Sequence, residues 1–470
     1  DREVERRRGD AMQAREFQRG LVERADLHRA TGLEVLHDAR LVRAAAVLFQ
    51  RAEQVREEIL RDPRSRRALE GLAPRLNTDI EETTRRARSI LTELAADFDL
   101  LNIKLFSSVL SFVWSQIYDG FEIDEEGLAR VREVAKERRL VLVPSHKSHV
   151  DYLVMSNLFY RYGLIPPHIA AGINLNFWPI GRFFRGAGAF FIRRSFAGDL
   201  LYEWVFKAYL VKILEEGFPI EFFIEGTRSR TGKLTPPKYG MLNMLVDAMR
   251  QGDVGGVAFV PISVGYEAII EGSSYKKELD GGEKKSEGLA DLLQTPKVLR
   301  ARYGRVFVEF GAPVDLARFV ARYHPEGVRE EVDQVELDRT VRRLAYRLVH
   351  GINDVTTVTP GAVGALVLLN SPARALTAET LAREAGFAVA FLRTREARFS
   401  QALRDAMEIH LARIHQPTAD SVELTSLDAF DQEFVTGKLP ATRTAGSSDE
   451  LLGQAAVSYT HLTLPTILLV

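Results

Sequence analysis

The sequence predicts an α/β protein, with a mixed, largely parallel sheet flanked by helices and with helical regions at both ends. Between about residues 138 and 310, short apolar runs alternate with stretches of helical periodicity, which is typical of strands joined by helices. Residues 1–98 are instead rich in Arg, Glu, Ala and Leu, with apolar residues at helical spacing. We therefore expect an N-terminal helical region (1–98), an α/β domain (99–330), a C-terminal helical region (331–445) and a tail (446–470) that is disordered or not native.

The composition excludes several classes of protein. The 470 residues contain no cysteine, which excludes a disulfide framework, thiol catalysis and cysteine-ligated metals. The formal net charge is −1, so nothing favours nucleic acid as a partner, and any anion site must be built locally. No charge-free apolar run reaches the roughly 20 residues that span a bilayer. The run from Leu105 to Tyr118 is expected to contact a membrane from one side, if at all.

Five apolar runs are expected to form strands of the sheet, and two stretches between them to form helices. Parallel sheets carry their chemistry on loops after the carboxyl ends of strands, so the polar residues that follow these runs are candidates for a site. A Gly-, Lys- and Glu-rich segment, Gly272 to Gly288, is expected to be an exposed, mobile loop. The strands are expected at Leu140–Pro144, Ala189–Ile192, Ile220–Ile224, Val257–Val260 and Val306–Phe310, and the helices at Tyr202–Glu215 and Met241–Met249.

The first candidate group follows the strand that ends at Pro144. His146 and Asp151 stand five residues apart, and Ser148 could cap a following helix with Asp151 in its first turn. The carboxylate would then fix the imidazole tautomer, and the imidazole would act as a general base on an alcohol. Spacing alone leaves two alternatives, a solvated loop histidine with a helix-capping aspartate, and a metal site that adds His149.

The second group is a run of arginines around the next strand. No acidic residue interrupts the run, and a guanidinium group can bind phosphate through two charge-assisted hydrogen bonds, worth roughly 1.5–3 kcal/mol each. The alternative is a charged surface loop beside a buried strand. The four cations are Arg182, Arg185, Arg193 and Arg194.

Two further segments follow strands. Residues 223–233 combine glycines, hydroxyl groups and three cations, which suits a phosphate, although a basic loop without a ligand is the alternative. This segment is not a nucleotide-binding P-loop, because five residues rather than four separate Gly226 from Gly232, and because Leu234 stands where a Ser or Thr is needed. Residues 260–267 read as a strand ending in a turn, which is a weak signal by itself.

In this order the four segments resemble the four motifs of the glycerophospholipid acyltransferase superfamily, namely His-x4-Asp, Phe-Ile-x-Arg, Glu-Gly-Thr-Arg-Ser and Val-Pro-Ile. Three other stretches, Phe112–Gly120, Pro167–Pro179 and Tyr266-Glu267, resemble one branch, the large membrane-bound bacterial glycerol-3-phosphate acyltransferases and their animal relatives. The similarity covers roughly residues 100 to 320. Some bacterial relatives have Gly where this chain has Thr227.

The resemblance implies an acyltransferase catalytic domain that moves a fatty acyl group from acyl-CoA or acyl carrier protein to the sn-1 hydroxyl of glycerol 3-phosphate. The product would be lysophosphatidic acid, in the first step of phospholipid synthesis. His146 would be the general base and Asp151 its orienting partner, and no metal or bound cofactor is implied, because the thioester supplies the driving force. The implied acceptor-binding residues are Arg194, Glu225, Gly226, Arg228 and Pro261, to which our electrostatic argument adds Arg182, Arg185 and Arg193.

The resemblance also implies a peripheral or monotopic enzyme on the cytoplasmic face of the cell (inner) membrane. The apolar run from Leu105 to Tyr118 would dock it in one leaflet, unless this run is a buried core helix. The alternative functions are acylation of dihydroxyacetone phosphate, acylation of a lysophospholipid, and silent lipid binding. The length and the residues after Pro167 disfavour the second, and the presence of both His146 and Asp151 disfavours the third. The sequence does not separate glycerol 3-phosphate from its ketone analogue.

Overall fold

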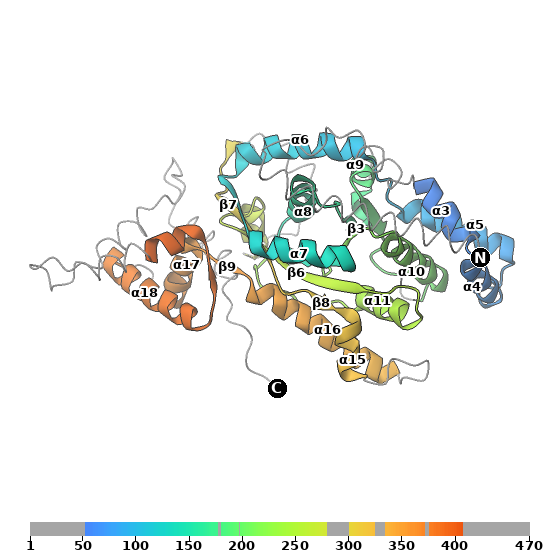
Figure 1. Cartoon of the computed structure of the whole chain (residues 1–470). Coiled ribbons are helices and arrows are strands. Elements are labelled where there is room, and N and C mark those ends of the chain that lie inside the picture. The colour runs from blue at the N-terminus through green and yellow to red at the C-terminus, as the bar shows by residue number, and fades with distance from the viewer. Residues whose placement is uncertain are drawn as a thin grey trace, which may run out of the picture.

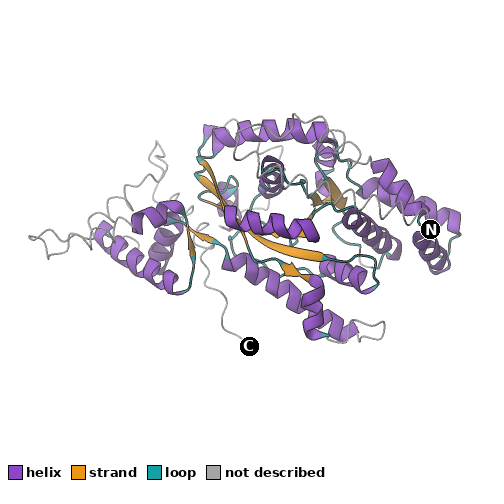
Figure 2. Ribbon diagram, in the orientation of Figure 1, coloured by secondary structure: helices purple, strands orange, loops and turns teal. Residues whose placement is uncertain are grey.

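The protein consists of an α/β body with helical regions at both ends, so the fold class predicted from the sequence is confirmed (Figures 1 and 2). The predictions for residues 1–51, 280–288 and 408–470 lie outside the described residues. The computed structural model describes residues 52–176, 180–196, 198–279, 300–324, 334–371 and 376–407.

The central sheet has eight strands, in the order β1-β7-β6-β2-β5-β3-β4 with β8 beside β6. Neighbouring strands are parallel except for β6, which runs antiparallel to β7 and β8. The sheet is therefore mixed and largely parallel, as predicted. Its strands are β1 (Gly120–Ile123), β2 (Arg139–Pro144), β3 (His168–Gly172), β4 (Ala189–Ile192), β5 (Ile220–Glu221), β6 (Val257–Tyr266), β7 (Arg305–Phe310) and β8 (Val314–Asp315).

All five predicted strands are present, and β5 is shorter than predicted. It ends at Glu221, so that residues 222–224 lead into a loop. β6 continues past Val260 as far as Tyr266, so the strand predicted at Val257–Val260 and the segment 260–267, which also read as a strand, form one element. The sequence did not predict β1 and β3. β1 is partly buried along its whole length, and β3 is partly buried at its last three residues, Ala-Ala-Gly. Neither strand therefore has the continuous apolar run of a buried strand.

Alternation along the strands sends side chains into two separate cores. On β2, Val141 and Val143 face one core, whereas Leu140 and Leu142 face the other. Helices cover the sheet on both faces (Figure 2), and the two predicted helices are α10 and α11. The first core is covered by α10 (Leu200–Glu215), α11 (Gly240–Arg250), α15 (Leu316–Tyr323) and α16 (Gln334–Asp354), and the second by α6 (Leu100–Ile117), α7 (Glu125–Glu137), α8 (Asp151–Arg161) and α9 (Ile180–Gly186).

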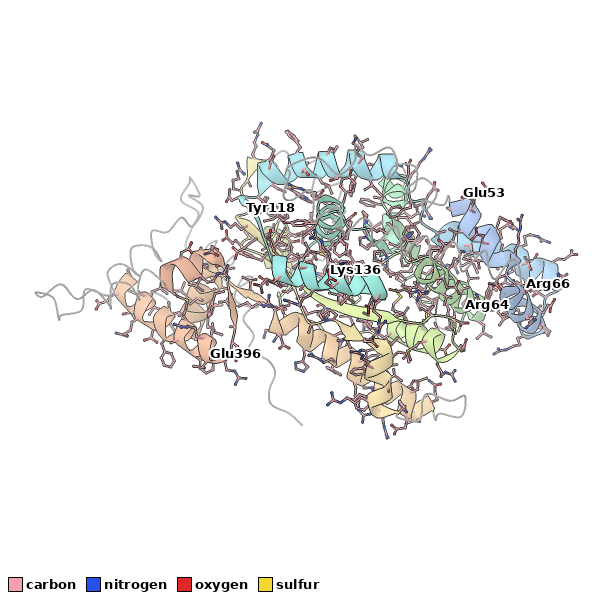
Figure 3. All side chains as sticks on the ribbon, viewed as in Figure 1. Glu53, Arg64, Arg66, Tyr118, Lys136 and Glu396 are labelled. Carbon is pink, nitrogen blue, oxygen red and sulfur yellow. The ribbon has the colours of Figure 1, made fainter. Side chains whose placement is uncertain are left out.

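The N-terminal region forms α3 (Ala52–Arg61), α4 (Pro63–Arg75) and α5 (Ile80–Leu94), which extend the first core beyond α10. Asp62 and Asp79 begin α4 and α5 by accepting hydrogen bonds from free backbone N–H groups. Arg64 of α4, labelled in Figure 3, forms an ion pair with Glu215 at the end of α10, at 3.1 Å. The predicted helical character of this region is confirmed over the described residues.

Helix α6 carries the long apolar run, and it lies along one side of the body (Figure 1). One of its faces, with Phe106, Leu110 and Trp114, is buried in the second core. The opposite face exposes apolar side chains, of which Phe112 is 67% exposed. One face of this run is therefore that of a core helix, and the other face is apolar and exposed. Over the described residues, no helix is long and apolar enough to cross a membrane.

The segment predicted to be an exposed loop from Gly272 begins instead as helix α12 (Gly272–Leu279). The prediction is wrong for these residues, because Tyr275 is only 2% exposed and joins the second core. The high content of Lys and Glu indicated an exposed segment, but Tyr275 is buried and packs in the second core.

Beyond α16 the chain forms a smaller helical unit with its own apolar core, next to the central sheet (Figure 1). Two short parallel strands tie this unit together. Arg398 joins it to the body through hydrogen bonds to Asp124 and Glu309. Its elements are β9 (Thr357–Val358), α17 (Pro360–Asn370), α18 (Ala378–Thr394) and β10 (Arg398–Phe399).

Candidate active site

His146 and Asp151 meet where β2 passes into α8. The His146 Nδ1 atom lies 3.0 Å from Asp151 Oδ2, and Asp151 is the first residue of α8. The same carboxylate oxygen accepts hydrogen bonds from the backbone N–H groups of Lys147 (2.7 Å) and Ser148 (2.9 Å). The loop is thus wrapped around the aspartate, which also sits at the favourable N-terminal end of a helix.

The capping prediction for Ser148 is wrong, although Asp151 does lie in the first turn. The residue before α8 is Val150, and it makes no side-chain cap. The Ser148 hydroxyl instead donates to the carboxylate of Glu271, at 2.8 Å. The Ser148 hydroxyl therefore binds Glu271, 123 positions later in the chain, and does not cap α8.

The second oxygen of Asp151 is held by a residue that the sequence analysis did not select for the site. Tyr266, at the end of β6, donates its hydroxyl to Asp151 Oδ1 at 2.6 Å. The Asp151 side chain is 0% exposed, and the backbone N–H groups of Lys147 and Ser148 and the Tyr266 hydroxyl all donate to it. Its contact with His146 then places the proton on Nδ1 and leaves Nε2 with a lone pair.

The loop after β5 packs against His146 on two sides. The imidazole stacks on Phe223 with ring centroids 3.8 Å apart and an interplanar angle of 18°. The His146 backbone N–H donates to Glu225 Oε1 (2.8 Å), and its carbonyl accepts from Ser229 N (2.8 Å). The His146 side chain keeps 15% of its surface exposed, so part of it is open to solvent.

Glu225 and Gly226 shape this loop. Glu225 Oε2 accepts from the backbone N–H of Thr235 (2.9 Å), so that its carboxylate bridges two loops, and burial raises its pKa. Gly226 has a φ of +65°, and a Cβ there would lie 2.9 Å from Lys238 Cγ. The structure brings both residues to His146, in positions that build the loop.

Arg228 lies on the other side of the same loop. Its Nη1 donates to the Tyr275 hydroxyl at 2.8 Å and lies 3.6 Å from Glu271 Oε1. Within the described residues no other group accepts a hydrogen bond from this guanidinium, which has five donors. Its side chain is 16% exposed. It is therefore a nearly buried cation with donors to spare, close to the His146 loop.

The four arginines around β4 do not form one cluster. Arg193 makes a two-pronged ion pair with Glu93 of α5, at 2.7 and 2.8 Å. Arg185 donates to backbone carbonyls at the end of α5. Both guanidinium groups are thus engaged in holding α5, and the structure does not support a phosphate-binding role for them. Arg182 and Arg194 are exposed and remain candidates.

Pro261 is buried in the middle of β6, opposite Val143 of β2. Its carbonyl accepts a hydrogen bond from Gly311 N (2.8 Å), and its ring lies against Gly351 of α16. The structure therefore gives Pro261 a packing position within the sheet, and no contact that links it to an acceptor.

The alternative metal site is not assembled. Among the described residues, no group of three or more potential ligands is placed to hold an ion. The Asp151 oxygens are taken by hydrogen-bond donors, and the His149 backbone N–H is bound to Glu271. His146, His149 and Asp151 thus lie at one loop, where hydrogen bonds to other protein groups hold them.

Lys147, between the two histidines of the loop, was also missed. It is 3% exposed, and burial lowers the pKa of its ammonium group to about 8, although the charges of Asp151 and Glu225 oppose this shift.

Glu271 and Tyr275 contact the loop from more than 120 positions further along the chain. No local sequence signal marks them, and only the pair Tyr266-Glu267 carried any resemblance.

Comparisons with known proteins agree with this architecture. Residues 123–265 match the model of the acyltransferase family, and residues 275–425 match the model of the glycerol-3-phosphate acyltransferase C-terminal region. Residues 123–265, which include most of the sheet and the His146–Asp151 pair, are thus by class an acyltransferase domain. The chain belongs to the glycerol-3-phosphate acyltransferase family.

Two bacterial relatives, both described as glycerol-3-phosphate acyltransferase, show how much of the family protein is present. The one from Actinobacillus succinogenes is 41% identical over 327 residues, which are 69% of this chain and 40% of the relative. The one from Aeromonas hydrophila is 42% identical over 318 residues, which are 67% of this chain and 39% of the relative. The chain therefore spans about 40% of the length of the curated relatives it matches.

A solved structure is also similar, at a lower level. The 1-acyl-sn-glycerophosphate (LPA) acyltransferase PlsC from Thermotoga maritima is 18% identical, with a TM-score of 0.30, over 53% of this chain and 78% of that chain.

Proposed function

We propose that this chain transfers a fatty acyl group from a thioester donor to the sn-1 hydroxyl of glycerol 3-phosphate, giving lysophosphatidic acid. The observation that carries the proposal is the hydrogen-bonded His146–Asp151 pair, with a buried carboxylate and a partly exposed histidine, next to a nearly buried arginine with unused donors. The relatives named glycerol-3-phosphate acyltransferase support the choice of acceptor.

In the proposed reaction, His146 Nε2 takes the proton from the acceptor hydroxyl while the oxygen attacks the thioester carbonyl. The tetrahedral intermediate then collapses, the carbon–sulfur bond breaks, and the imidazolium returns its proton to the leaving thiolate. Asp151 holds Nδ1–H and stabilises the imidazolium. General-base help of this kind is worth roughly 10²–10⁴-fold in rate. No metal or bound cofactor takes part in these steps.

We call residues 145–150, between β2 and α8, the catalytic loop. The phosphate of the acceptor would bind Arg228, because this guanidinium group has unused hydrogen-bond donors beside the catalytic loop. Arg194, exposed directly after β4, is the second candidate for this contact. A charge-assisted hydrogen bond from arginine to phosphate contributes roughly 1.5–3 kcal/mol. Glu225 and Gly226 would act by shaping the loop, as their positions indicate.

The donor would be acyl-CoA or acyl carrier protein, and the enzyme would work from the cytoplasmic face of the cell membrane as a peripheral protein. The exposed face of α6 supports membrane contact, because Leu105, Val109 and Phe112 follow one another at helical spacing and are 57%, 49% and 67% exposed. Such a stripe could enter one leaflet, where acyl donors and products partition.

The test is a competition between acceptors. The purified chain would be given acyl-CoA or acyl carrier protein with glycerol 3-phosphate, dihydroxyacetone phosphate or a lysophospholipid, and kcat/KM would be compared. We expect the highest value with glycerol 3-phosphate. A clear preference for the ketone would replace the proposed acceptor, and binding of lipids without any acyl transfer would indicate a silent member of the fold.

A further inference from the structure

Three residues that follow the four motifs hold the catalytic loop along its length. Tyr266 donates to Asp151 Oδ1 (2.6 Å), and Tyr275 donates to the carbonyl of Lys147 (3.1 Å). Glu271 accepts from the Ser148 hydroxyl (2.8 Å) and from the His149 backbone N–H (2.8 Å). We call Tyr266, Glu271 and Tyr275 the brace. Each of the three is at most 3% exposed, so these bonds lie in a low-dielectric setting where they are strong.

The brace also holds Arg228. Its Nη1 donates a hydrogen bond to the Tyr275 hydroxyl at 2.8 Å, and the same hydroxyl donates a hydrogen bond to the Lys147 carbonyl. The Arg228 Nη1 lies 3.6 Å from Glu271, which is longer than the 2.7–2.9 Å of a strong charge-assisted hydrogen bond. Arg228 is thus connected to the loop through two brace residues, and its ion pair with Glu271 is loose.

We propose that the phosphate of the acceptor activates the His146–Asp151 pair through Glu271 and Tyr275, in addition to fixing the acceptor in place. This inference rests on the proposed function. An anion on Arg228 competes with Glu271 for the guanidinium, which leaves the Glu271 carboxylate to the Ser148 hydroxyl and the His149 N–H.

Binding of the anion to Arg228 also strengthens the hydrogen bonds that connect Arg228 to the loop through Tyr275. An arginine held by a phosphate still donates to the Tyr275 hydroxyl, and this polarises the hydroxyl toward the Lys147 carbonyl. Binding energy from a part of the substrate that does not react is in this way used to order the reacting groups. Glu271 and Tyr275 are positioning residues, because they reach the substrate only through Arg228 and the loop.

The test divides the substrate into two pieces. Glycerol supplies the hydroxyl without the phosphate, and the phosphite dianion supplies the anion without the hydroxyl. We expect millimolar phosphite to accelerate acylation of glycerol by the intact chain at least tenfold at saturating acyl donor. In Arg228→Ala the acceleration should disappear, since the anion has lost its partner.

Two brace variants make the test specific. Tyr275→Phe should lower kcat for glycerol 3-phosphate about tenfold, with KM changed by less than threefold, and should abolish the phosphite effect. Glu271→Gln keeps the size of the side chain but removes the charge that competes for Arg228, so half-saturation by phosphite should fall to a lower concentration while the maximal acceleration shrinks. Tyr209→Phe is the matched control, because Tyr209 is a buried tyrosine whose hydroxyl accepts one hydrogen bond, from Ala96 N, in the first core.

The outcomes separate the two proposals. Acylation of glycerol 3-phosphate without any effect of phosphite on glycerol would overturn the activation by phosphate and leave the proposed function intact. A Tyr275→Phe variant that raises KM alone would reduce Tyr275 to a binding residue and would also overturn it. Absence of acyl transfer to glycerol 3-phosphate would remove the proposed function and this inference with it.

Discussion

Replacing Asp151 by asparagine changes one charge in the site while keeping its shape. In the native chain, Oδ2 accepts from His146 Nδ1, Lys147 N and Ser148 N, and Oδ1 accepts from the Tyr266 hydroxyl. An asparagine can keep its oxygen on the side of the three nitrogens and turn its amide toward the tyrosine, whose hydroxyl can also accept. The imidazole then keeps its tautomer and loses the negative charge beside it.

The size of the effect follows from the distance. The contact between His146 Nδ1 and Asp151 Oδ2 is 3.0 Å, which puts the centres of the two charges about 4 Å apart. At an effective dielectric constant of about 20, unit charges at this distance attract by about 4 kcal/mol. This attraction exists only once the imidazole has taken the proton, so its loss should lower kcat by about 10³-fold.

The assay measures kcat and KM for acyl transfer to glycerol 3-phosphate, together with the thermal unfolding midpoint. We expect Asp151→Asn to lose about 10³-fold in kcat with KM almost unchanged. Asp79→Asn is the control, since asparagine begins a helix as well as aspartate does, and it should leave kcat unchanged. A loss of less than tenfold in a folded Asp151→Asn variant would refute the electrostatic role of the aspartate.

Three further predictions concern binding, stability and membrane contact. Arg228→Ala should lower kcat/KM for glycerol 3-phosphate about 10- to 100-fold, and Arg228→Lys should recover part of this; an unchanged value would remove Arg228 from the phosphate site. Burial lowers the pKa of His168 from 6.5 to about 3, so the unfolded chain binds a proton that the folded chain excludes, and stability is lost as the pH falls below 6.5. Urea unfolding of the native chain should therefore lose about 2 kcal/mol more between pH 7 and pH 5 than unfolding of His168→Phe, and equal losses would contradict the buried neutral histidine. Phe112→Ser should weaken binding to anionic lipid vesicles about tenfold, which corresponds to about 1.5 kcal/mol of lost burial; unaltered binding would argue against α6 as the docking face.

Much of the fold could be predicted because its signals are local. Continuous apolar runs marked β2, β4 and β7, which lie in a sheet covered on both faces. The edge strand β1 and the small residues of β3 gave no such run, so both were missed. Helix α12 was mistaken for a loop because a single buried residue, Tyr275, anchors an otherwise polar segment.

In the candidate site, too, some residues could be predicted from the sequence and others could not. His146 and Asp151 were selected through the order of the four motifs, because their spacing alone left two alternatives. In the structure a short loop joins them and brings the carboxylate back to the ring. Arg185 and Arg193 were expected to bind phosphate, yet their partners lie on α5, about 90 to 100 positions earlier in the chain. Pairing over such distances is decided by packing of the whole domain, and a single sequence does not display it.

The same limit applies to the brace. Glu271 and Tyr275 reach the loop across 123 and 128 positions, from a segment whose composition is that of a surface. Sequence reasoning found the groups that would perform the chemistry, and the structure added the residues that hold them in place.

The most direct measurement is acyl transfer to glycerol 3-phosphate by the purified chain and by His146→Ala, with release of the donor thiol followed over time. We expect the native chain to form lysophosphatidic acid and the variant to lose at least 10²-fold in kcat. His350→Ala, at an exposed histidine on α16, should keep the native rate. A His146→Ala variant that stays within a few-fold of the native rate would contradict the assignment of His146 as the general base.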